Sequence, residues 1–307
     1  MRYIWNTTDF HLQNTAVSLG KFDGFHVGHR LLIEYVTSLK EKGYQAVTFS
    51  FFQHPGFMVS NALSKKLIYT EAEKVKKAEE LGSDCFISYP FNKEVMNTEP
   101  EEFVRSVLVE KLGAKVVVVG KDYHFGKDRS GNVQMLEELG KKYGFVVKAF
   151  DKVIMDGLEV SSTRIRNDLQ EGKIKQANAM LGSPYSITGK VVYGNQIGRT
   201  LGMPTANIIP PAEKLIPPNG VYASRIFVEG DVYYGITNIG YKPTVGDKNE
   251  KGVETFIFDF QESIYDKEIK VELFAYERGE QKFGSLDELK MQMERDCQFG
   301  KEYFKQF

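Results

Sequence analysis

The hydrophobic pattern of the chain changes near residue 184, and this change constrains the fold more than any other feature. From Thr15 to about Gly182, short runs rich in β-branched and aromatic residues alternate with segments whose apolar residues recur at helical spacing. The runs predict strands at 16–22, 45–52, 85–91, 115–120 and 145–150, and the helical segments span 29–43, 70–82, 101–113 and 132–144. This alternation predicts a doubly wound α/β domain with a parallel sheet.

A run of four valines at 116–119 supports this fold class. It is apolar at every position, which is typical of a strand that helices cover on both faces of a parallel sheet. Thr98 and Glu101 have the spacing of a capping box for the third helix, and Pro100 suits the first turn of that helix.

From Pro184 onward, strand-like runs follow one another with almost no helix between them. They lie at 186–194, 220–228, 231–239, 253–260 and 268–278, separated by turn residues. Because an open antiparallel sheet would leave exposed strand edges, we expect a small closed antiparallel barrel.

The C-terminal tail returns to a helical pattern. Ser285 and Glu288 have the spacing of a capping box, and an apolar stripe follows, formed by Leu286, Leu289 and Met293. We therefore expect a terminal helix. We place the domain boundary within 181–186, which divides the chain into domains 1–184 and 185–307.

The composition disfavours several classes of function. Lys+Arg 40 against Asp+Glu 41 gives a formal net charge of -1, so the chain lacks the basic excess typical of nucleic-acid binding. No apolar run is long enough to span a bilayer, and the first residues lack the apolar core of a signal peptide. Cys85 and Cys297 are far apart, which fits buried thiols and excludes a zinc–thiolate site. We therefore expect a cytoplasmic protein that binds neither nucleic acid nor membrane.

Residues 20–29, GKFDGFHVGH, lie between the first predicted strand and the first long helix. In an open α/β sheet, ligands bind at the C-terminal ends of strands, where the next helix offers free N–H groups and the positive end of its dipole. Glycines there let the backbone approach a phosphate, and His26 and His29 can donate hydrogen bonds to phosphate oxygens. A glycine-rich turn with two surface histidines fits equally well. Zinc binding fits poorly because no third ligand has a recognisable spacing.

Two further segments carry polar residues after predicted strands. Residues 160–169, VSSTRIRNDL, start a helix with three candidate caps and two arginines suited to bidentate phosphate contacts, namely Ser161, Ser162, Thr163, Arg164 and Arg166. Residues 120–131, GKDYHFGKDRSG, leave the valine strand as a loop with aromatic, histidine and basic side chains. An ordinary capped helix with solvated arginines and a plain exposed loop are the alternatives.

The second half offers candidate ligands for a cation and a candidate base. Thr205 and Asn207 are two residues apart in an extended segment, so their side chains point the same way and present the hard oxygens that magnesium prefers. A polar barrel loop is the alternative. Glu254 leads an apolar strand face, where a carboxylate can act as a general base. It can equally lie at a wet strand end without a role.

Three motifs of the first half, GKFDGFHVGH, GKDYHFG and VSSTRIR, resemble in order and spacing the adenylyltransferase module of bacterial bifunctional riboflavin kinase/FAD synthetases. The first and last resemble the H-x-G-H and I-S-S-T-x-x-R motifs of the nucleotidyltransferase superfamily, which implies a Rossmann-like domain. The resemblance implies transfer of the adenylyl group of ATP to FMN, giving FAD and pyrophosphate, with magnesium helping. It implies catalytic roles for His26, His29 and Arg166. It also implies ATP contacts at Gly20, Phe22, Asp23, Gly24, Gly28, Ser162 and Thr163, and flavin contacts at Asp122, Tyr123, His124 and Phe125.

Two segments depart from the pattern of that family. The usual Pro-His-Pro stretch reads Gln53-His54-Pro55, and the usual Asp-Phe-Arg-Phe-Gly loop reads Asp122-Tyr123-His124-Phe125-Gly126. These departures motivate the alternative hypothesis of a riboflavin kinase whose N-terminal half has lost transfer activity. A flavin- or nucleotide-binding regulatory protein without turnover is a further alternative.

The second half resembles riboflavin kinases, a family of six-stranded barrels. GRTLGMPTANI, GVYAS, GITNIGYKPTVG and VETFIFDF occur in the order seen there and cover most of residues 185–283. The resemblance implies phosphorylation of riboflavin to FMN by ATP and Mg²⁺. Thr205 and Asn207 would hold the magnesium, and Glu254 would deprotonate the ribityl 5′-hydroxyl.

The same resemblance implies further contacts in the barrel half. It assigns the phosphate loop to Gly194, Gly198 and Gly202, and it places Arg278 with the terminal helix at the border of the flavin. The implied partners are small molecules, namely riboflavin, FMN, FAD and ATP. We expect a monomer or a weak homo-oligomer.

Overall fold

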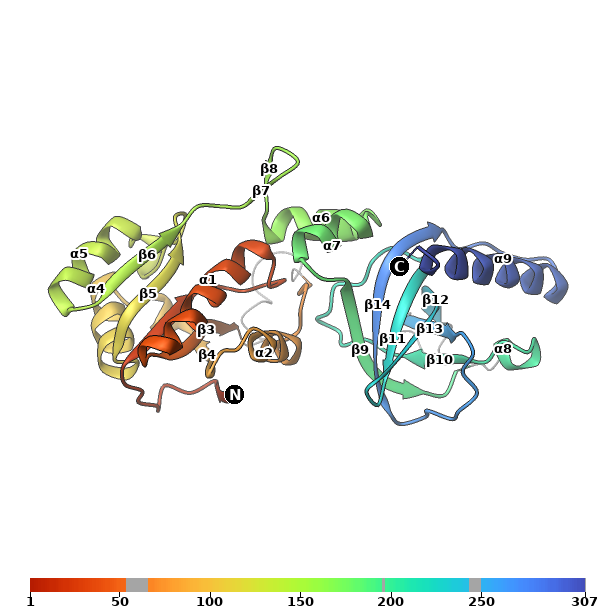
Figure 1. Ribbon diagram of the computed structural model, residues 1–307, viewed down its shortest axis with the longest axis horizontal. Helices are drawn as coiled ribbons and strands as arrows, with labels where there is room; N and C mark the ends of the chain where they lie inside the picture. Colours follow the sequence, from red (N-terminus) through yellow and green to blue (C-terminus); the bar gives the residue numbers. More distant parts are fainter. Residues whose placement is uncertain (54–65, 195–196, 243–249, 307) are drawn as a thin grey trace. The chain divides into compact units, whose positions relative to one another are not determined.

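Figure 1 shows the computed structural model, which describes residues 1–53, 66–194, 197–242 and 250–306. The chain forms two compact units, Met1–Ser162 and Thr163–Phe307. Helices α6 (Ser162–Gln170) and α7 (Ile174–Leu181) precede the expected boundary but fall almost entirely in the second unit. Asn178 of α7 explains this, because its side chain hydrogen-bonds the backbone of both Leu273 and Tyr185 in the barrel. The division into functional domains 1–184 and 185–307 stays a prediction.

The first unit contains a six-stranded parallel sheet with the strand order β1-β4-β3-β2-β5-β6. Its strands are β1 (Arg2–Trp5), β2 (Thr15–Leu19), β3 (Gln45–Gln53), β4 (Cys85–Phe91), β5 (Ala114–Gly120) and β6 (Val146–Phe150). The predicted α/β class is confirmed. The valine strand is covered on both faces, since three successive side chains are fully buried, namely Val117, Val118 and Val119.

Helices connect these strands, as the apolar spacing predicted. They are α1 (Val27–Ser38) with a 3-10 turn at Leu39–Lys42, α2 (Glu71–Glu80), α3 (Lys93–Met96), α4 (Pro100–Phe103) continuing as a π-helix over Val104–Lys111, a 3-10 turn at Lys127–Arg129, and α5 (Val133–Tyr143). A short hairpin of β7 (Ile154–Met155) and β8 (Leu158–Glu159) precedes α6.

The capping box predicted for the third helix is wrong. The helix does begin at Pro100, but Thr98 Oγ1 donates to the carbonyl of Glu94 at 3.1 Å. Glu101 instead accepts from the Tyr143 hydroxyl at 2.8 Å. Thr98 therefore binds the end of the preceding helix α3, and Glu101 binds a residue far away in the sequence that the local pattern does not reveal.

The second unit contains a closed six-stranded antiparallel barrel in the order β10-β13-β12-β11-β14-β9, which confirms the prediction (Figure 1). Its elements are β9 (Tyr185–Val192), α8 (Ile197–Thr200), β10 (Thr205–Ile208), β11 (Gly220–Val228), β12 (Asp231–Lys242), β13 (Glu250–Ile257), β14 (Glu268–Arg278) and α9 (Leu286–Phe304). A row of fully buried hydroxyls crosses three strands, with Ser224 2.7 Å from Thr237 and Thr237 2.9 Å from Thr255.

The N-terminal cap of α9 is confirmed, because the Ser285 side chain accepts the Glu288 N–H at 3.2 Å. The apolar stripe predicted for this helix is wrong. Leu286 is 60% exposed, whereas the buried positions of α9 are Asp296, Cys297 and Gly300. The helix is rotated in this way because Asp296 pairs with an arginine of β14.

Candidate active sites

The strand order of the parallel sheet reverses beside β2. The chain adds β3 and β4 on one side of β2 and then crosses to β5 and β6 on the other side. In open α/β sheets, ligands bind at the carboxyl ends of the strands at such a reversal. The loops 20–29 after β2 and 120–131 after β5 both leave the sheet there. The fold therefore brings together two of the three segments that the sequence singled out.

Loop 20–29 is tightly wound. Gly24 has φ 92°, and Phe22 and Phe25 are also left-handed, at φ 49° and 41°. Both phenylalanine rings are buried, and a Cβ at Gly20 would lie 3.0 Å from the ring of Phe22. Asp23 Oδ1 accepts a backbone N–H from the segment before α2 at 2.9 Å. Because the ring of Phe22 is fully buried, only its backbone can meet a ligand.

The two histidines of this loop form one packed unit. His26 is the N-cap of α1, and its Nδ1 accepts the backbone N–H of His29 at 3.3 Å. The two imidazoles are stacked, with their ring centroids 3.6 Å apart and an interplanar angle of 16°. His26 is 8% exposed and His29 is half-buried, so the interpretation as two surface histidines is wrong.

Burial controls the charge of both histidines. It lowers the pKa of His26 to about 4, and the backbone carbonyl of His26 and the charge of Asp122 offset only part of this effect. Burial, followed by the charge of His26, lowers the pKa of His29 well below its ordinary value. Within the described residues, the buried His29 Nδ1 has no hydrogen-bond partner. Both rings are therefore neutral near pH 7 and offer N–H donors rather than cations.

Loop 120–131 faces the histidines, since the charge of Asp122 acts on His26. Asp122 and His124 are exposed, and His124 Nδ1 lies 2.9 Å from the Asp122 carbonyl oxygen. Tyr123 and Phe125 stack at 5.9 Å, and Phe125 is buried in the core of the unit. Of the four predicted flavin contacts, Asp122 and His124 are thus accessible, whereas Phe125 packs into the core and anchors the loop.

The third segment begins α6. Ser162 Oγ donates to the backbone carbonyl of Asp23 at 2.7 Å, so Ser162 lies beside loop 20–29. Thr163 is exposed and Arg166 is partly buried, and both belong to the second unit. Their contacts with ATP phosphates stay predictions.

In the barrel, β10 and β13 bring together the three predicted polar residues. Asn207 lies opposite Glu254 in the antiparallel register, and Thr205 lies opposite Phe256. Thr205 Oγ1 donates to Glu254 Oε1 at 2.5 Å, and Asn207 is buried. Because β13 extends from residue 250, Glu254 lies within the strand, so the alternative of a wet strand end is wrong.

The three glycines predicted for the phosphate loop have different surroundings. A Cβ at Gly194 would lie 2.6 Å from Asn207 Nδ2, and one at Gly198 would overlap the carbonyl oxygen of Met203. Gly202 has φ 78° and open space around it. Two of these glycines therefore permit close packing, and the third permits a left-handed turn.

A cavity of about 290 Å³ adjoins the polar strand pair. Thr205, Asn207 and Gly194 line it together with Tyr265, whose ring stacks on Tyr193 at 4.0 Å. Neither tyrosine was predicted from the sequence. Tyr193 lies directly before a glycine-rich loop, which is a usable signal, whereas no local pattern marks Tyr265.

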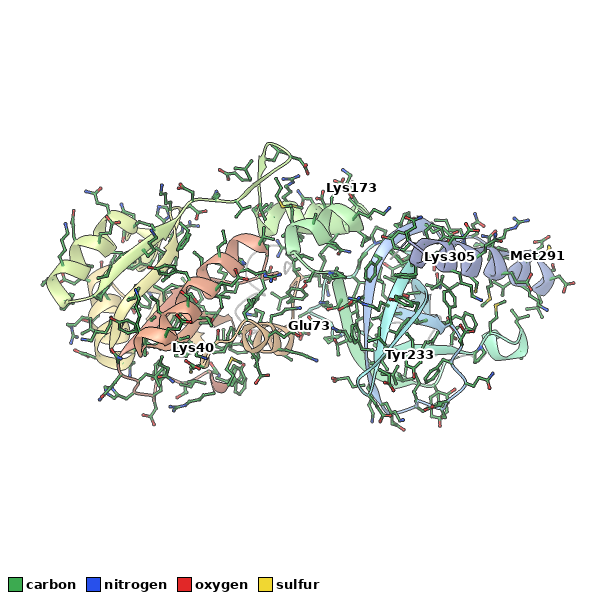
Figure 2. All side chains as sticks on the ribbon, viewed as in Figure 1. Lys40, Glu73, Lys173, Tyr233, Met291 and Lys305 are labelled. Atoms are coloured by element: carbon green, nitrogen blue, oxygen red, sulfur yellow. The ribbon has the colours of Figure 1, made fainter. Side chains whose placement is uncertain are left out.

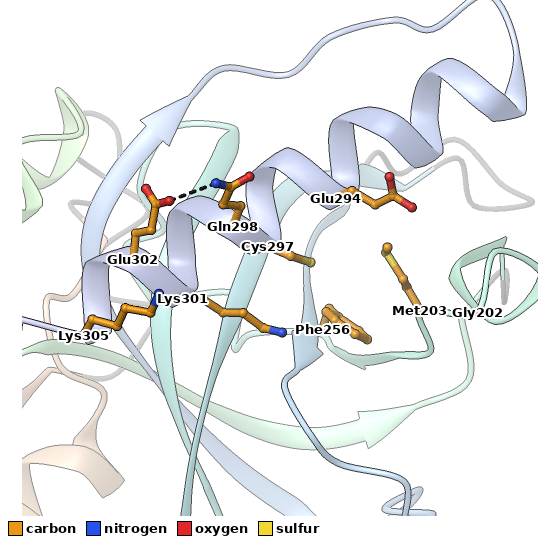
Figure 3. A pocket seen from close by; sticks show the side chains of 9 residues that line it. All are labelled: Gly202, Met203, Phe256, Glu294, Cys297, Gln298, Lys301, Glu302 and Lys305. Atoms are coloured by element: carbon orange, nitrogen blue, oxygen red, sulfur yellow. Dashed lines mark hydrogen bonds between the residues drawn. The ribbon is translucent and has the colours of Figure 1, made fainter.

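A larger cavity, of about 480 Å³, lies between α9 and the segment before β10 (Figure 3). Its walls include Gly202, Met203, Phe256, Cys297, Lys301 and Lys305, the last of which Figure 2 labels at the end of α9. Met203 and Lys301 point toward this cavity from its two walls. The volume suits a ligand of cofactor size, and the lining combines apolar surface with a few charged groups.

Arg278, a predicted flavin contact, holds α9 against β14. Its guanidinium donates to both carboxylate oxygens of Asp296, at 2.8 and 2.5 Å, and Asp296 is buried. The neighbouring Glu277 has a buried Oε2 without a hydrogen-bond partner among the described residues. Burial, and then the charge of Asp296, raises the pKa of Glu277 to about 7 despite the opposing effect of Arg278.

Some expectations fall outside what the structure describes. Gln53 ends β3, but its side chain and the residues His54 and Pro55 lie outside the described residues. Among the described residues, no cluster of three or more His, Cys, Asp or Glu side chains could hold a metal ion. No helix in the described ranges is both long and apolar enough to cross a membrane.

The fold and its sites define a class of protein in which an α/β domain with a histidine-capped helix precedes a small barrel with an oxygen-rich strand pair. The FAD synthetase family model matches residues 9–164, and the riboflavin kinase family model matches residues 181–304. The chain belongs to the bifunctional riboflavin kinase/FMN adenylyltransferase family.

Relatives with that name align over nearly the whole chain. The protein from Buchnera aphidicola is 36% identical over 95% of this chain and 94% of its own length, and that from Bacillus subtilis is 35% identical over 94% and 92%. The protein from Escherichia coli K12 is 32% identical over 99% and 97%. The crystal structure of a macrolide-efflux protein from Streptococcus pneumoniae superposes with a TM-score of 0.86 at 28% identity, covering 96% of this chain and 97% of that one. This superposition supports the two-part fold.

Proposed function

We propose that this chain phosphorylates riboflavin to FMN in its barrel and then adenylylates FMN to FAD in its α/β domain, with ATP as the donor in both steps. Family membership supports both activities. The observation that carries the kinase half is the 2.5 Å hydrogen bond from Thr205 to Glu254, beside the buried Asn207. It joins an oxygen-rich phosphate site to a carboxylate that can serve as a base.

The donor chemistry of the strand pair fits magnesium. Thr205 and Asn207 present hydroxyl and amide oxygens, the ligand type that Mg²⁺ prefers, and they would hold the ion. The Thr205 proton points at Glu254, and a hydroxyl also has two acceptor lone pairs that can face a cation. Bound magnesium would supply charge neutralisation for the phosphates of ATP.

In the kinase step, Glu254 accepts the proton of the ribityl 5′-hydroxyl while the hydroxyl oxygen attacks the γ-phosphorus of ATP. The bond from the γ-phosphorus to the bridging oxygen breaks, and ADP leaves. ATP lies at the smaller cavity, which Thr205, Asn207 and Gly194 line. Flavin lies at the larger cavity, which Phe256 lines two residues after Glu254. Arg278 contributes by fixing α9, one wall of that cavity, against the barrel.

In the adenylyltransferase step, a phosphate oxygen of FMN attacks the α-phosphorus of ATP, and pyrophosphate leaves. The attacking phosphate is largely ionised at neutral pH, so this step requires no general base. His26 and His29 donate hydrogen bonds to phosphate oxygens as charge builds, while loop 20–29 and the start of α6, with Ser162, Thr163 and Arg166, position the nucleotide. Asp122 and His124 border the flavin from the opposite loop.

The test is product analysis of wild type and Glu254→Gln, supplied with magnesium and ATP and either riboflavin or FMN. We expect wild type to make FMN and FAD. The variant should lose about 10²- to 10⁴-fold of its riboflavin phosphorylation, the usual effect of removing a general base. It should still convert added FMN to FAD, which is the internal control for folding. Near-normal phosphorylation in the variant would contradict the role of Glu254.

The same assay separates the alternatives. FMN without FAD from wild type would support the kinase-only hypothesis that Gln53 and His124 motivate. Neither product would support a binding protein without turnover.

A further inference from the structure

We propose that Asn238 of β12 is a specificity residue of the kinase site: its amide hydrogen-bonds a secondary hydroxyl of the ribityl chain, next to the 5′-hydroxyl that is phosphorylated. The identity of the substrate rests on the proposed kinase function. The proposal adds a residue to that site and a rule of selection, because the barrel should prefer a flavin with a polyol chain to one with a plain hydroxyalkyl chain.

The antiparallel register places Asn238 beside the candidate base. Glu254 of β13 has two cross-strand neighbours, Asn207 of β10 on one side and Asn238 of β12 on the other. Side chains that lie directly opposite each other in such pairs have Cβ atoms about 4.5–5.5 Å apart. The Asn238 amide therefore lies one strand away from Glu254, on the side away from Asn207.

Asn238 and Glu254 project from the same, outer face of the barrel. Thr237 precedes Asn238 and Thr255 follows Glu254, and the hydroxyls of these two fully buried threonines lie 2.9 Å apart. Because side chains alternate along a strand, the neighbours of the two buried threonines point to the opposite face. The amide and the carboxylate can therefore meet the same ligand.

The amide of Asn238 is available to a ligand. Asn238 is exposed, and its side chain makes no hydrogen bond to any residue that the structure describes. A Cβ at Gly240 would overlap Glu280 Oε1 and would lie 3.6 Å from Asn238 Nδ2, so the glycine keeps the space beside the amide open. Glu280 is itself engaged, because its Oε2 accepts from Asn219 Nδ2 at 2.9 Å. Asparagine is depleted in strands, so strand stability does not explain its presence here.

The two cavities of the barrel give the direction in which the acceptor chain leaves Glu254. Asn207 lines the smaller cavity, the proposed ATP site. Cys297 of α9 lines the larger cavity, the proposed flavin site, and belongs to one apolar cluster with Ile236. Ile236 lies two residues before Asn238 and therefore on the same face of β12. A chain that runs from Glu254 toward the larger cavity leaves Asn207 behind and brings its hydroxyls within reach of Asn238.

An amide suits a polyol because it offers both kinds of hydrogen bond. Its carbonyl oxygen accepts a hydroxyl proton, and its NH₂ group donates to a hydroxyl oxygen. It carries no charge, so it does not compete with Glu254 for the proton of the 5′-hydroxyl. One neutral hydrogen bond of this kind is worth about 10-fold in affinity.

The test pairs riboflavin with an analogue in which an unbranched hydroxypentyl chain replaces the ribityl chain. This analogue keeps the flavin ring and the terminal hydroxyl but lacks the secondary hydroxyls. Asn238→Leu keeps the size of the side chain and removes both hydrogen-bonding groups. We expect kcat/KM for riboflavin to fall about 10-fold and kcat/KM for the analogue to change by less than about twofold. A merely structural role of Asn238 would lower both values equally.

Two further variants serve as controls. Asn238→Ala should show the same change in substrate preference, which separates loss of the hydrogen bond from misfit of the leucine. Asp231→Leu adds the same apolar side chain at an exposed position at the far end of β12, where it lies opposite Val228. It should leave kcat/KM for both flavins within about twofold of wild type.

Titration of flavin fluorescence, with ADP and magnesium present, measures binding without phosphoryl transfer. The Kd of riboflavin should rise about 10-fold in Asn238→Leu, and the Kd of the analogue should stay constant. Equal losses for both flavins, or an unchanged preference in both Asn238 variants, would overturn the role of Asn238. If wild type phosphorylates neither flavin, the kinase function is refuted, and the titration still decides whether Asn238 recognises the secondary hydroxyls.

Discussion

Mild acid should destabilise the first unit through His26. Its pKa is about 4 in the folded chain against an ordinary value of 6.5, chiefly because the ring is buried. Between these two values the unfolded chain binds a proton that the folded chain does not. The stabilisation that the neutral His26 ring contributes to the free energy of unfolding is therefore complete above about pH 6.5, and it is lost as the pH falls toward 4.

The magnitude follows from the shift. A difference of about 2.5 pKa units corresponds to about 3 kcal/mol at full protonation, since each unit is worth about 1.4 kcal/mol. His29 acts in the same direction, because its pKa is also lowered by burial. A loss of this size is a large fraction of the stability of an ordinary domain.

The assay is urea unfolding of wild type and His26→Asn between pH 7.5 and 4, followed by fluorescence. The chain has one tryptophan, Trp5 on β1, so the signal reports the first unit specifically. Asparagine can still cap the helix, and it does not titrate. The difference between the free energies of unfolding of the two proteins is therefore free of most contributions from other ionisable groups. We expect this difference to change by about 2–3 kcal/mol across the range, with wild type losing more. A constant difference would show that His26 titrates alike in the folded and unfolded states, and the lowering of its pKa by burial would then be refuted.

Two further predictions concern the barrel. Gly194→Ala would push a Cβ into the amide of Asn207, 2.6 Å away, and should lower riboflavin phosphorylation about 10²-fold; Gly284→Ala, which meets only a flexible carboxylate at 3.3 Å, should stay within about twofold in the same assay. The raised pKa of Glu277, about 7, means that the folded chain holds a proton that the unfolded chain releases above pH 4.5, so stability falls as the pH rises from 4.5 to 7. Glu277→Gln should therefore stabilise the chain at pH 8 by about 1 kcal/mol, allowing for solvent screening of this half-buried group, and have no effect at pH 4.5. A melting-temperature gain that is equal at both pH values would contradict this cause.

Periodicity alone was sufficient to predict most of the fold. Five of the six strands of the parallel sheet and the closed barrel follow from alternation and from turn residues. β1 escaped prediction because it has four residues with only Ile4 buried, which is too short for a pattern. The buried face of α9 also escaped, because an ion pair between Asp296 and Arg278, and not a stripe of apolar residues, sets its rotation.

The candidate sites were predictable where residues are close in the chain or lie at equivalent strand ends. Thr205 and Asn207 share a face by strand alternation, and the loops after β2 and β5 meet because parallel strands end at one edge. The hydrogen bond from Thr205 to Glu254 was not predictable, since it depends on the register between β10 and β13. The stacking of Tyr193 on Tyr265 likewise joins residues far apart in the sequence.

The glycines of both sites have a role that their sequence motifs alone do not indicate. The pattern around Gly28 and Gly194 indicates a backbone that approaches a phosphate. In the structure, the space of each missing Cβ borders a functional side chain instead, the ring of His26 in one site and the amide of Asn207 in the other. A glycine with this role positions a neighbour and does not itself set how tightly ATP binds. Alanine at position 28 should therefore lower kcat for FAD formation more than it raises the KM for ATP, because the ring of His26 acts mainly when charge builds on the phosphates.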